Sequence, residues 1–432
     1  MKMNEITHDP SEYIRGLQQL LISDKKKIAF LFGAGTSLAK KNETSLVVPA
    51  IGKMTKMIET ELSKTEKYKS AISEIKQEIG EKEFNIETFL SNIEEKKHII
   101  GNGILNGLKL GDFDSLIVET KNQIREIVCV HEKILEKKEL SNLIHVDFAE
   151  WIGRADRKCA VEIFTTNYDY FLELGMEEKN IPYFDGFSGS YKPFFFPESV
   201  DDLSYLPKQT KLWKLHGSLG WHLDSDIDKN IEKVWRRDSD CQDILIYPST
   251  LKYADSKKQP YIALMDRLTN FLKQPDTILI ICGYSFGDLH INERILTALK
   301  SNTAAHVYVL YYDILWKDGK RNGYTLLEDS NLAKLGKANG KISVLGCRNA
   351  VIGCQYGKWR LKREPDKEDT INVNLYFDED GPLNVDDPKE EVKKGGQNWT
   401  GEGEVILSDF AKFVTFLQSM ILQNKPYGGQ HE

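Results

Sequence analysis

Five short apolar runs, each followed by small or polar residues, limit the possible folds of this chain more than any other feature. Polar and apolar residues do not alternate within the runs, which is typical of strands buried on both faces of a sheet. Such strands occur in parallel sheets covered by helices on both sides, so the sequence predicts an α/β fold built on a parallel sheet. The runs are IAFLF at 28–32, VEIFTTN at 161–167, KLWKLHG at 211–217, TILIICG at 277–283 and HVYVLYYD at 306–313.

A long helical insertion is expected between the first and second runs. No proline occurs between Pro49 and Pro182, and proline is excluded from helix interiors. Residues 53–149 are rich in Lys, Glu, Ile and Leu, with apolar positions three and four apart. We therefore expect a sheet domain formed by residues 1–52 and 150–335, interrupted by a helical insertion at 53–149.

Residues 336–432 have a different texture and predict a small α+β elaboration. The alternating INVNLYF at 371–377 is typical of an antiparallel strand, and the acid- and glycine-rich stretch 378–403 of a mobile loop. A closing helix is expected from about 407 to 422, and its apolar face either packs back on the sheet or contacts a partner. That face carries Phe410, Phe413, Phe416, Leu417 and Met420.

Charge and hydropathy exclude several classes of protein. The 432 residues hold 58 Lys and Arg against 65 Asp and Glu, a net charge of −7, so direct sequence-specific binding of nucleic acid is not expected. The longest apolar runs have about six residues, far fewer than the roughly 20 of a membrane span. Because the first residues also lack an apolar signal segment, we expect a cytoplasmic protein without a membrane anchor.

The cysteines predict no zinc site. They are scattered without any C-x-x-C pair, so no zinc ribbon is expected, and no metal ligands are assigned. In the cytosol they should be reduced thiols. The six are Cys129, Cys159, Cys241, Cys282, Cys347 and Cys354.

The residues that end the runs are the candidates for chemistry, because ligands of an open parallel sheet bind beyond the carboxyl ends of its strands. The first run ends in a glycine turn that suits a phosphate or is simply structural. After the second run, Asp169 either takes part in a site or makes an Asx turn. His216, after the third, is a candidate general base or an ordinary satisfied histidine. The turns are GAGTS at 33–37, TTNYD at 165–169, LHGS at 215–218 and GYSFGD at 283–288.

Taken in this order, the four motifs resemble the sirtuin-like NAD-consuming superfamily, whose sheet is Rossmann-like. The resemblance covers about residues 25–315 and implies that NAD is a substrate. It implies that Asn167 lies against the nicotinamide ribose, that Asp169 braces its loop or contacts nicotinamide, and that His216 takes a proton from a ribose hydroxyl. The residues implied to bind NAD are Gly33, Ala34, Gly35, Thr36, Ser37, Thr166, Gly283 and Ser285.

Two departures narrow the resemblance. Protein-deacylating sirtuins carry a four-cysteine zinc ribbon that this chain lacks, and SLVVPAIGKM at 45–54 stands where they have a GIPDFR-like element. The chain is more similar to the sirtuin-like (silent information regulator-like) NADases of bacterial antiphage defence, including an N-I-E-x-x-L-S element at 85–91. That element is equally typical of an ordinary capped helix.

The resemblance implies an enzyme that hydrolyses NAD to nicotinamide and ADP-ribose as the effector of an antiphage system. Such an enzyme must be gated, so we expect a homo-oligomer that works with a HerA-type ATPase. The alternative is a catalytically silent subunit that senses NAD or ADP-ribose and serves in assembly.

Overall fold

A mostly parallel sheet of ten strands forms the centre of this computed structural model, in which residues 6–154, 157–226, 231–238, 259–317, 319–366, 369, 371–380 and 399–422 are described. In order across the sheet the strands are β1 (Thr7–His8), β16 (Gln355–Trp359), β15 (Asn349–Ile352), β14 (Ile342–Leu345), β11 (His306–Leu310), β10 (Thr277–Cys282), β2 (Lys27–Phe32), β3 (Glu162–Thr165), β7 (Thr210–Lys214) and β4 (Tyr183–Phe184).

The five predicted runs are all strands of this sheet, and the α/β, Rossmann-like fold is confirmed. Strands β11, β10, β2, β3 and β7 are adjacent and parallel. In β2, Phe30 and Phe32 face one buried cluster while Ala29 and Leu31 face another. Because both faces are buried, every position can be apolar, which is why the run does not alternate.

Two layers of helices cover the two faces of the sheet. One cluster joins the sheet to α1 (Pro10–Ile22), α8 (Ile144–Arg154), α9 (Phe171–Glu178) and α15 (Phe410–Leu422). The other joins it to α10 (Pro197–Asp201), α12 (Tyr261–Lys273), α13 (Leu289–Ser301) and α14 (Asn331–Ala338). Among the described residues, none of the helices has the length and apolar character of a membrane span.

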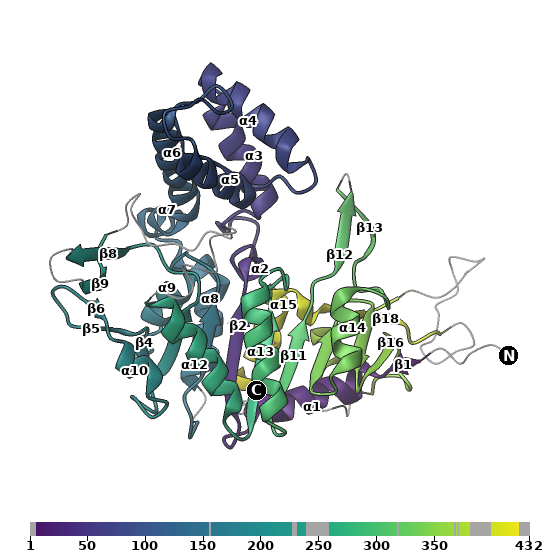
Figure 1. Ribbon diagram of the computed structural model, residues 1–432. Coiled ribbons are helices and arrows are strands. Elements are labelled where there is room, and N and C mark those ends of the chain that lie inside the picture. Colours follow the sequence, from purple (N-terminus) through teal and green to yellow (C-terminus); the bar gives the residue numbers. More distant parts are fainter. Residues whose placement is uncertain are drawn as a thin grey trace.

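A helical segment with its own core stands above the carboxyl ends of the central strands (Figure 1). It consists of α3 (Ile51–Leu62), α4 (Glu66–Ile79), α5 (Ile86–Ile99), α6 (Leu110–Val128) and α7 (Val130–Lys137), and a short 3₁₀ turn at Leu140–Asn142 leads back to α8. The predicted end of the insertion at 149 falls inside α8, whose Phe148 and Trp151 pack against the sheet.

Smaller elements decorate this framework. A four-stranded sheet contains β5 (Phe187–Ser188), β6 (Phe194–Phe195), β9 (Ile231–Arg236) and β8 (Trp221–Asp226). A hairpin of β12 (Ile314–Lys317) and β13 (Lys320–Tyr324) projects from the same end of the main sheet as the helical segment (Figure 1). A further pair is formed by β17 (Phe377–Glu379) and β18 (Gly403–Val405), and short turns of helix are α2 (Ala34–Ser37), η2 (Val373–Leu375) and η3 (Ile406–Ser408).

The predicted strand at 371–377 is wrong over most of its length. Residues 373–375 form η2, because the Asn372 side chain accepts a hydrogen bond from the Asn374 amide and turns the chain. The strands β14, β15 and β16 do pair antiparallel in part, but they extend the main sheet. Of the predicted mobile loop, residues 381–398 lie outside the described residues.

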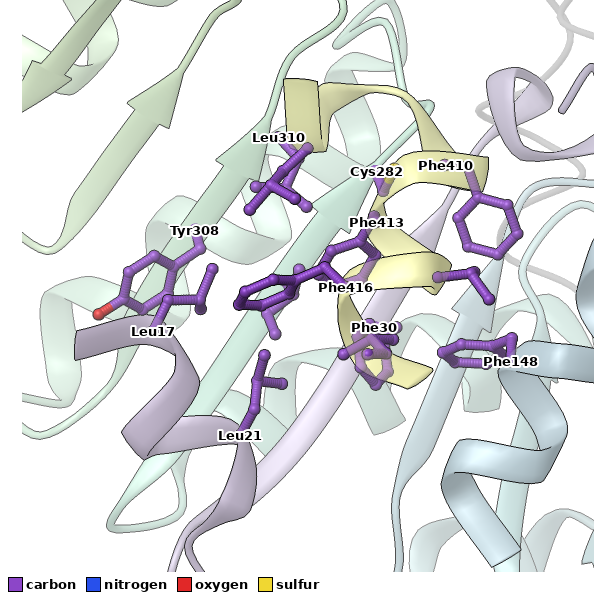
Figure 2. Close-up of a cluster of buried hydrophobic side chains, with 14 of the residues drawn as sticks. Leu17, Leu21, Phe30, Phe148, Cys282, Tyr308, Leu310, Phe410, Phe413 and Phe416 are labelled. Carbon is purple, nitrogen blue, oxygen red and sulfur yellow. The ribbon is translucent and has the colours of Figure 1, made fainter. Parts of the chain in front are cut away.

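The closing helix packs back on the sheet. Figure 2 shows Phe410, Phe413 and Phe416 of α15 in one buried cluster with Phe30 of β2 and Phe148 of α8. The ring centroids of Phe30 and Phe413 lie 6.3 Å apart, and those of Phe32 and Phe410 5.1 Å apart. This apolar face is therefore part of the core and is not available to a partner.

We expect Phe413→Ala to lower the free energy of unfolding by about 3–5 kcal/mol, the usual cost of removing a buried ring from a packed core. Phe413 is fully buried, whereas its neighbour Lys412 is exposed. The matched control Lys412→Ala should change stability by about 0.5 kcal/mol or less. Urea unfolding followed by fluorescence would measure both; equal effects of the two substitutions would contradict this packing.

Candidate active site

A cavity of about 450 Å³ lies where the central strands β10, β2, β3 and β7 end. One wall comes from the four turns that follow these strands. The facing wall comes from the helical segment and from residues 48–50, which precede α3. Of the turns, it is lined by Ala34, Gly35, Ser37, Thr166, Asn167, Tyr168, Asp169, His216, Gly283, Tyr284, Ser285, Gly287 and Asp288; of the facing wall, by Val48, Pro49, Ala50, Ile51, Met54, Ile86, Glu87, Ile124 and Val128.

Most of the residues predicted to bind NAD line this cavity, but Gly33 and Thr36 lie behind its wall. Thr36 is fully buried, and its hydroxyl donates to the Gly33 carbonyl over 2.9 Å. The amides of Gly33, Gly35 and Thr36 donate to backbone carbonyls. The first two amides bond to Cys282 and Gly283 at the end of β10, and the Thr36 amide bonds to Gly33 within the turn. A ligand therefore meets the turn chiefly through Ala34, Gly35 and Ser37.

The first and fourth turns touch backbone to backbone, and glycine makes this possible. A Cβ atom on Gly35 would lie 2.6 Å from the Gly283 Cα, and one on Gly283 would lie 2.6 Å from the Thr36 amide nitrogen. Gly283 also has a φ of +67°, which other residues rarely adopt. The Gly35 amide donates to the Gly283 carbonyl over 2.9 Å, so the ends of β2 and β10 are held together.

Asn167 connects the second turn to the first. Its Nδ2 lies 2.8 Å from the Ser37 hydroxyl, 3.0 Å from that of Thr36 and 3.1 Å from the Gly33 carbonyl oxygen. Because a carbonyl only accepts, the atom facing Gly33 must be the amide nitrogen. All three of these hydrogen bonds to described residues use Nδ2 of Asn167. Its Oδ1 is therefore the atom that can accept a hydrogen bond from water or a ribose hydroxyl.

Asp169 braces the same two turns. One carboxylate oxygen accepts from the Ser37 hydroxyl over 2.6 Å, and the other accepts from the Phe171 amide over 3.0 Å. The bond from the Phe171 amide makes the Asx turn that was one of the two alternatives for Asp169. The bond from the Ser37 hydroxyl ties this Asx turn to the glycine turn. Asp169 thus holds the loop that carries Asn167, whatever its contact with a ligand.

His216 pairs with Asp288 across the cavity floor. Its Nε2 lies 2.9 Å from a carboxylate oxygen of Asp288, and both side chains are buried. The other oxygen of Asp288 accepts from the amides of His290 and Ile291 and caps α13. An imidazole held by a fixed carboxylate is oriented for proton transfer.

Two functional groups were not predicted from the sequence. Asp288 ends the quoted GYSFGD motif but was given no role. Lys214, at the end of β7, lies 2.6 Å from the Glu173 carboxylate and donates to the Asp169 carbonyl and the Ser218 hydroxyl. The available signal was the presence of lysines, Lys211 and Lys214, in a run predicted to be buried, since a buried charge must be paired.

The residues that hold the site have shifted acid–base properties. Burial raises the pKa of the Glu173 carboxyl, while the Lys214 ammonium opposes that shift. Burial lowers the pKa of His131, which packs edge-on against Tyr170. Neutral imidazole is therefore the favoured form behind the second turn.

Within the described part of the chain, one group of three potential metal ligands lies close together, at the junction of α6 and α7. Ligand atoms of Cys129, His131 and Glu132 lie within 4.8 Å of one another. Three ligands are fewer than the four of a structural zinc site. That the protein works without zinc stays a prediction.

Comparison with known protein families identifies the domain to which part of the sheet belongs. Residues 161–334 match the family model described as the SIR2-like domain. This part of the chain is a SIR2-like domain. No curated protein matches the chain.

The SIR2-like domain contains three of the four turns, including Asn167, His216 and Asp288. Members of the SIR2 family use NAD, and a domain of this kind indicates an NAD-consuming enzyme. The glycine turn at 33–37 lies before the matched residues, and β2 brings it to the SIR2-like domain by pairing with both β10 and β3.

His145 should make the fold sensitive to acid. It is buried behind Asp169, between Phe171 and Phe410, and burial lowers its pKa from 6.5 to about 4. Between those values the unfolded chain binds a proton that the folded chain excludes, so stability is lost as the pH falls from 6.5 toward 4. At pH 5 this amounts to about 2 kcal/mol.

We expect His145→Leu to reduce the loss of unfolding free energy between pH 7.5 and pH 5 by about 2 kcal/mol. Urea unfolding at the two pH values measures this, with His98→Leu, at an exposed position of α5, as the control. An unchanged pH dependence in His145→Leu would show that this imidazole is not held neutral.

Proposed function

We propose that the protein hydrolyses NAD to nicotinamide and ADP-ribose in this cavity. The observation that carries the proposal is that Asn167 and His216, from turns after the neighbouring strands β3 and β7, line one cavity. A nucleotide-binding platform needs neither an oriented imidazole nor a fixed amide oxygen beside it. Their pairing favours the enzyme over the silent sensing subunit.

The reaction requires little acid catalysis. The glycosidic bond between C1′ of the ribose and the ring nitrogen breaks, and its electron pair neutralises the cationic nicotinamide. The oxygen of a water molecule bonds to C1′, and one proton is released. Asn167 Oδ1 would orient this water or a ribose hydroxyl, and His216, held by Asp288, would take the proton or polarise the hydroxyls.

The helical wall supports hydrolysis over acyl transfer. Val48, Pro49, Ile51 and Met54 stand where deacylating sirtuins have their GIPDFR-like element, and they give this side of the cavity an apolar surface. Water is small enough to reach C1′ in such a site, so we propose it as the acceptor.

Asn167→Ala and His216→Ala should each lower the rate of nicotinamide release by about 10² or more, because each removes a group that orients the reactants. Chromatography of nicotinamide after incubation with NAD measures the rate. His98→Ala, on the exposed side of α5, is the control and should retain full activity.

The thermal midpoint of each variant should be measured beside its rate, since Asn167 also bridges two turns. Release at the wild-type rate from the doubly substituted protein would refute the assignment. Tight NAD binding by the wild type without any nicotinamide would favour the sensing subunit instead.

We further propose that the enzyme is the effector of an antiphage system and works as a homo-oligomer with a HerA-type ATPase. This rests on the resemblance of the four motifs and on the need to restrain an NAD-consuming activity. Since the apolar face of α15 is buried in the core, we propose the helical segment as the surface for a regulatory contact. Its exposed apolar residues include Ile99, Ile104 and Val118.

Size-exclusion chromatography with light scattering should find an oligomer, and addition of the HerA-type ATPase should change both the mass of the complex and the rate of NAD cleavage. Ile99→Ser together with Ile104→Ser should weaken that response without changing the activity of the isolated protein. A monomer that is fully active alone and indifferent to the ATPase would contradict the proposal.

A further inference from the structure

The charge of the cavity lining is one-sided. Three carboxylate side chains line it, those of Glu87, Asp169 and Asp288, and among the described residues no Lys or Arg does. Asp169 and Asp288 come from the turns and are engaged by Ser37, His216 and backbone amides. Glu87 differs because it comes from the facing wall, which is otherwise apolar.

The backbone that carries Glu87 is fixed by the start of α5. Asn85 caps the helix, and its side-chain oxygen accepts from the amides of Glu87 and Thr88 over 2.9 and 3.0 Å. The Thr88 hydroxyl in turn accepts from the Asn85 amide, and the Thr55 hydroxyl of α3 accepts from that of Ile86. These bonds hold the second residue of α5 at the cavity.

A carboxylate in the first turn of a helix has an ordinary explanation, since it complements the helix dipole by about 0.3–1 kcal/mol. That explanation applies equally to an exposed residue and does not require the side chain to face a ligand. Here the same residue is the acidic group of an apolar wall opposite Asn167 and His216. Glu87 is half-buried, so its carboxylate interacts with a bound charge more strongly than a fully exposed carboxylate would.

We propose that Glu87 determines specificity by recognising the charge of the ligand's nicotinamide end. This deepens the proposed function and rests on it. In oxidised NAD that end is a cationic ring with a neutral carboxamide, which a carboxylate attracts. In nicotinic acid adenine dinucleotide a carboxylate replaces the carboxamide. Its negative charge would meet that of Glu87, and like charges brought together in a site lower the affinity.

The test compares NAD with nicotinic acid adenine dinucleotide in the wild type, Glu87→Gln and Glu87→Asp. We expect the wild type to prefer NAD and Glu87→Gln to lower the ratio of the two kcat/KM values about tenfold. Glu87→Asp, which keeps the charge, should retain most of the preference. Both substrates are measured on one preparation, so a loss of folded protein cancels from the ratio.

Glu95→Gln is the matched control, because Glu95 is exposed on the same helix and does not line the cavity. It should leave the ratio unchanged. A ratio that stays within about twofold in Glu87→Gln, while the wild type releases nicotinamide, overturns the role of Glu87 alone.

Equilibrium binding of both dinucleotides separates this proposal from the proposed function. If the wild type binds NAD without releasing nicotinamide, hydrolysis fails, and the ratio of the two dissociation constants still tests Glu87 by the same tenfold criterion. If neither dinucleotide binds, both proposals are wrong.

Discussion

The backbone contact between the first and fourth turns determines the geometry of the whole site. Gly35 and Gly283 approach so closely that a single added Cβ atom would lie 2.6 Å from the opposite backbone. This contact joins the end of β2 to the end of β10, while β2 pairs on its other side with β3. The side chains of Ser37, Asn167 and Asp169 then form a continuous set of hydrogen bonds from one strand end to the next.

The strands and the turns after them could be predicted because their causes are local. A run buried on both faces must be apolar throughout, and a turn that passes another backbone must contain glycine. The failures have local causes too. In INVNLYF, polar and apolar residues alternate as in a strand, but the segment forms a 3₁₀ turn that Asn372 stabilises. Alternation alone therefore did not distinguish a strand from this turn.

What the sequence could not predict is the pairing of buried polar and charged side chains over long separations. Lys214 with Glu173, and His216 with Asp288, join residues that meet only when the strands are assembled. A buried charge without its partner is strongly destabilising, so each pair constrains how its elements pack. The ends of β7, α9 and α13 are therefore fixed by the same contacts that orient the candidate catalytic groups.

The candidate active site extends beyond the SIR2-like domain at 161–334. That domain carries Asn167, His216 and Asp288, but the glycine turn that Asn167 bonds comes from β2, more than a hundred residues earlier. Without β2, the strands β3 and β10 would lose their shared neighbour at the centre of the sheet. The facing wall comes from α3, α5 and α6 and from residues 48–50 before α3. The helical segment therefore forms most of one wall of the cavity, and any partner that moves it would act directly on the candidate active site.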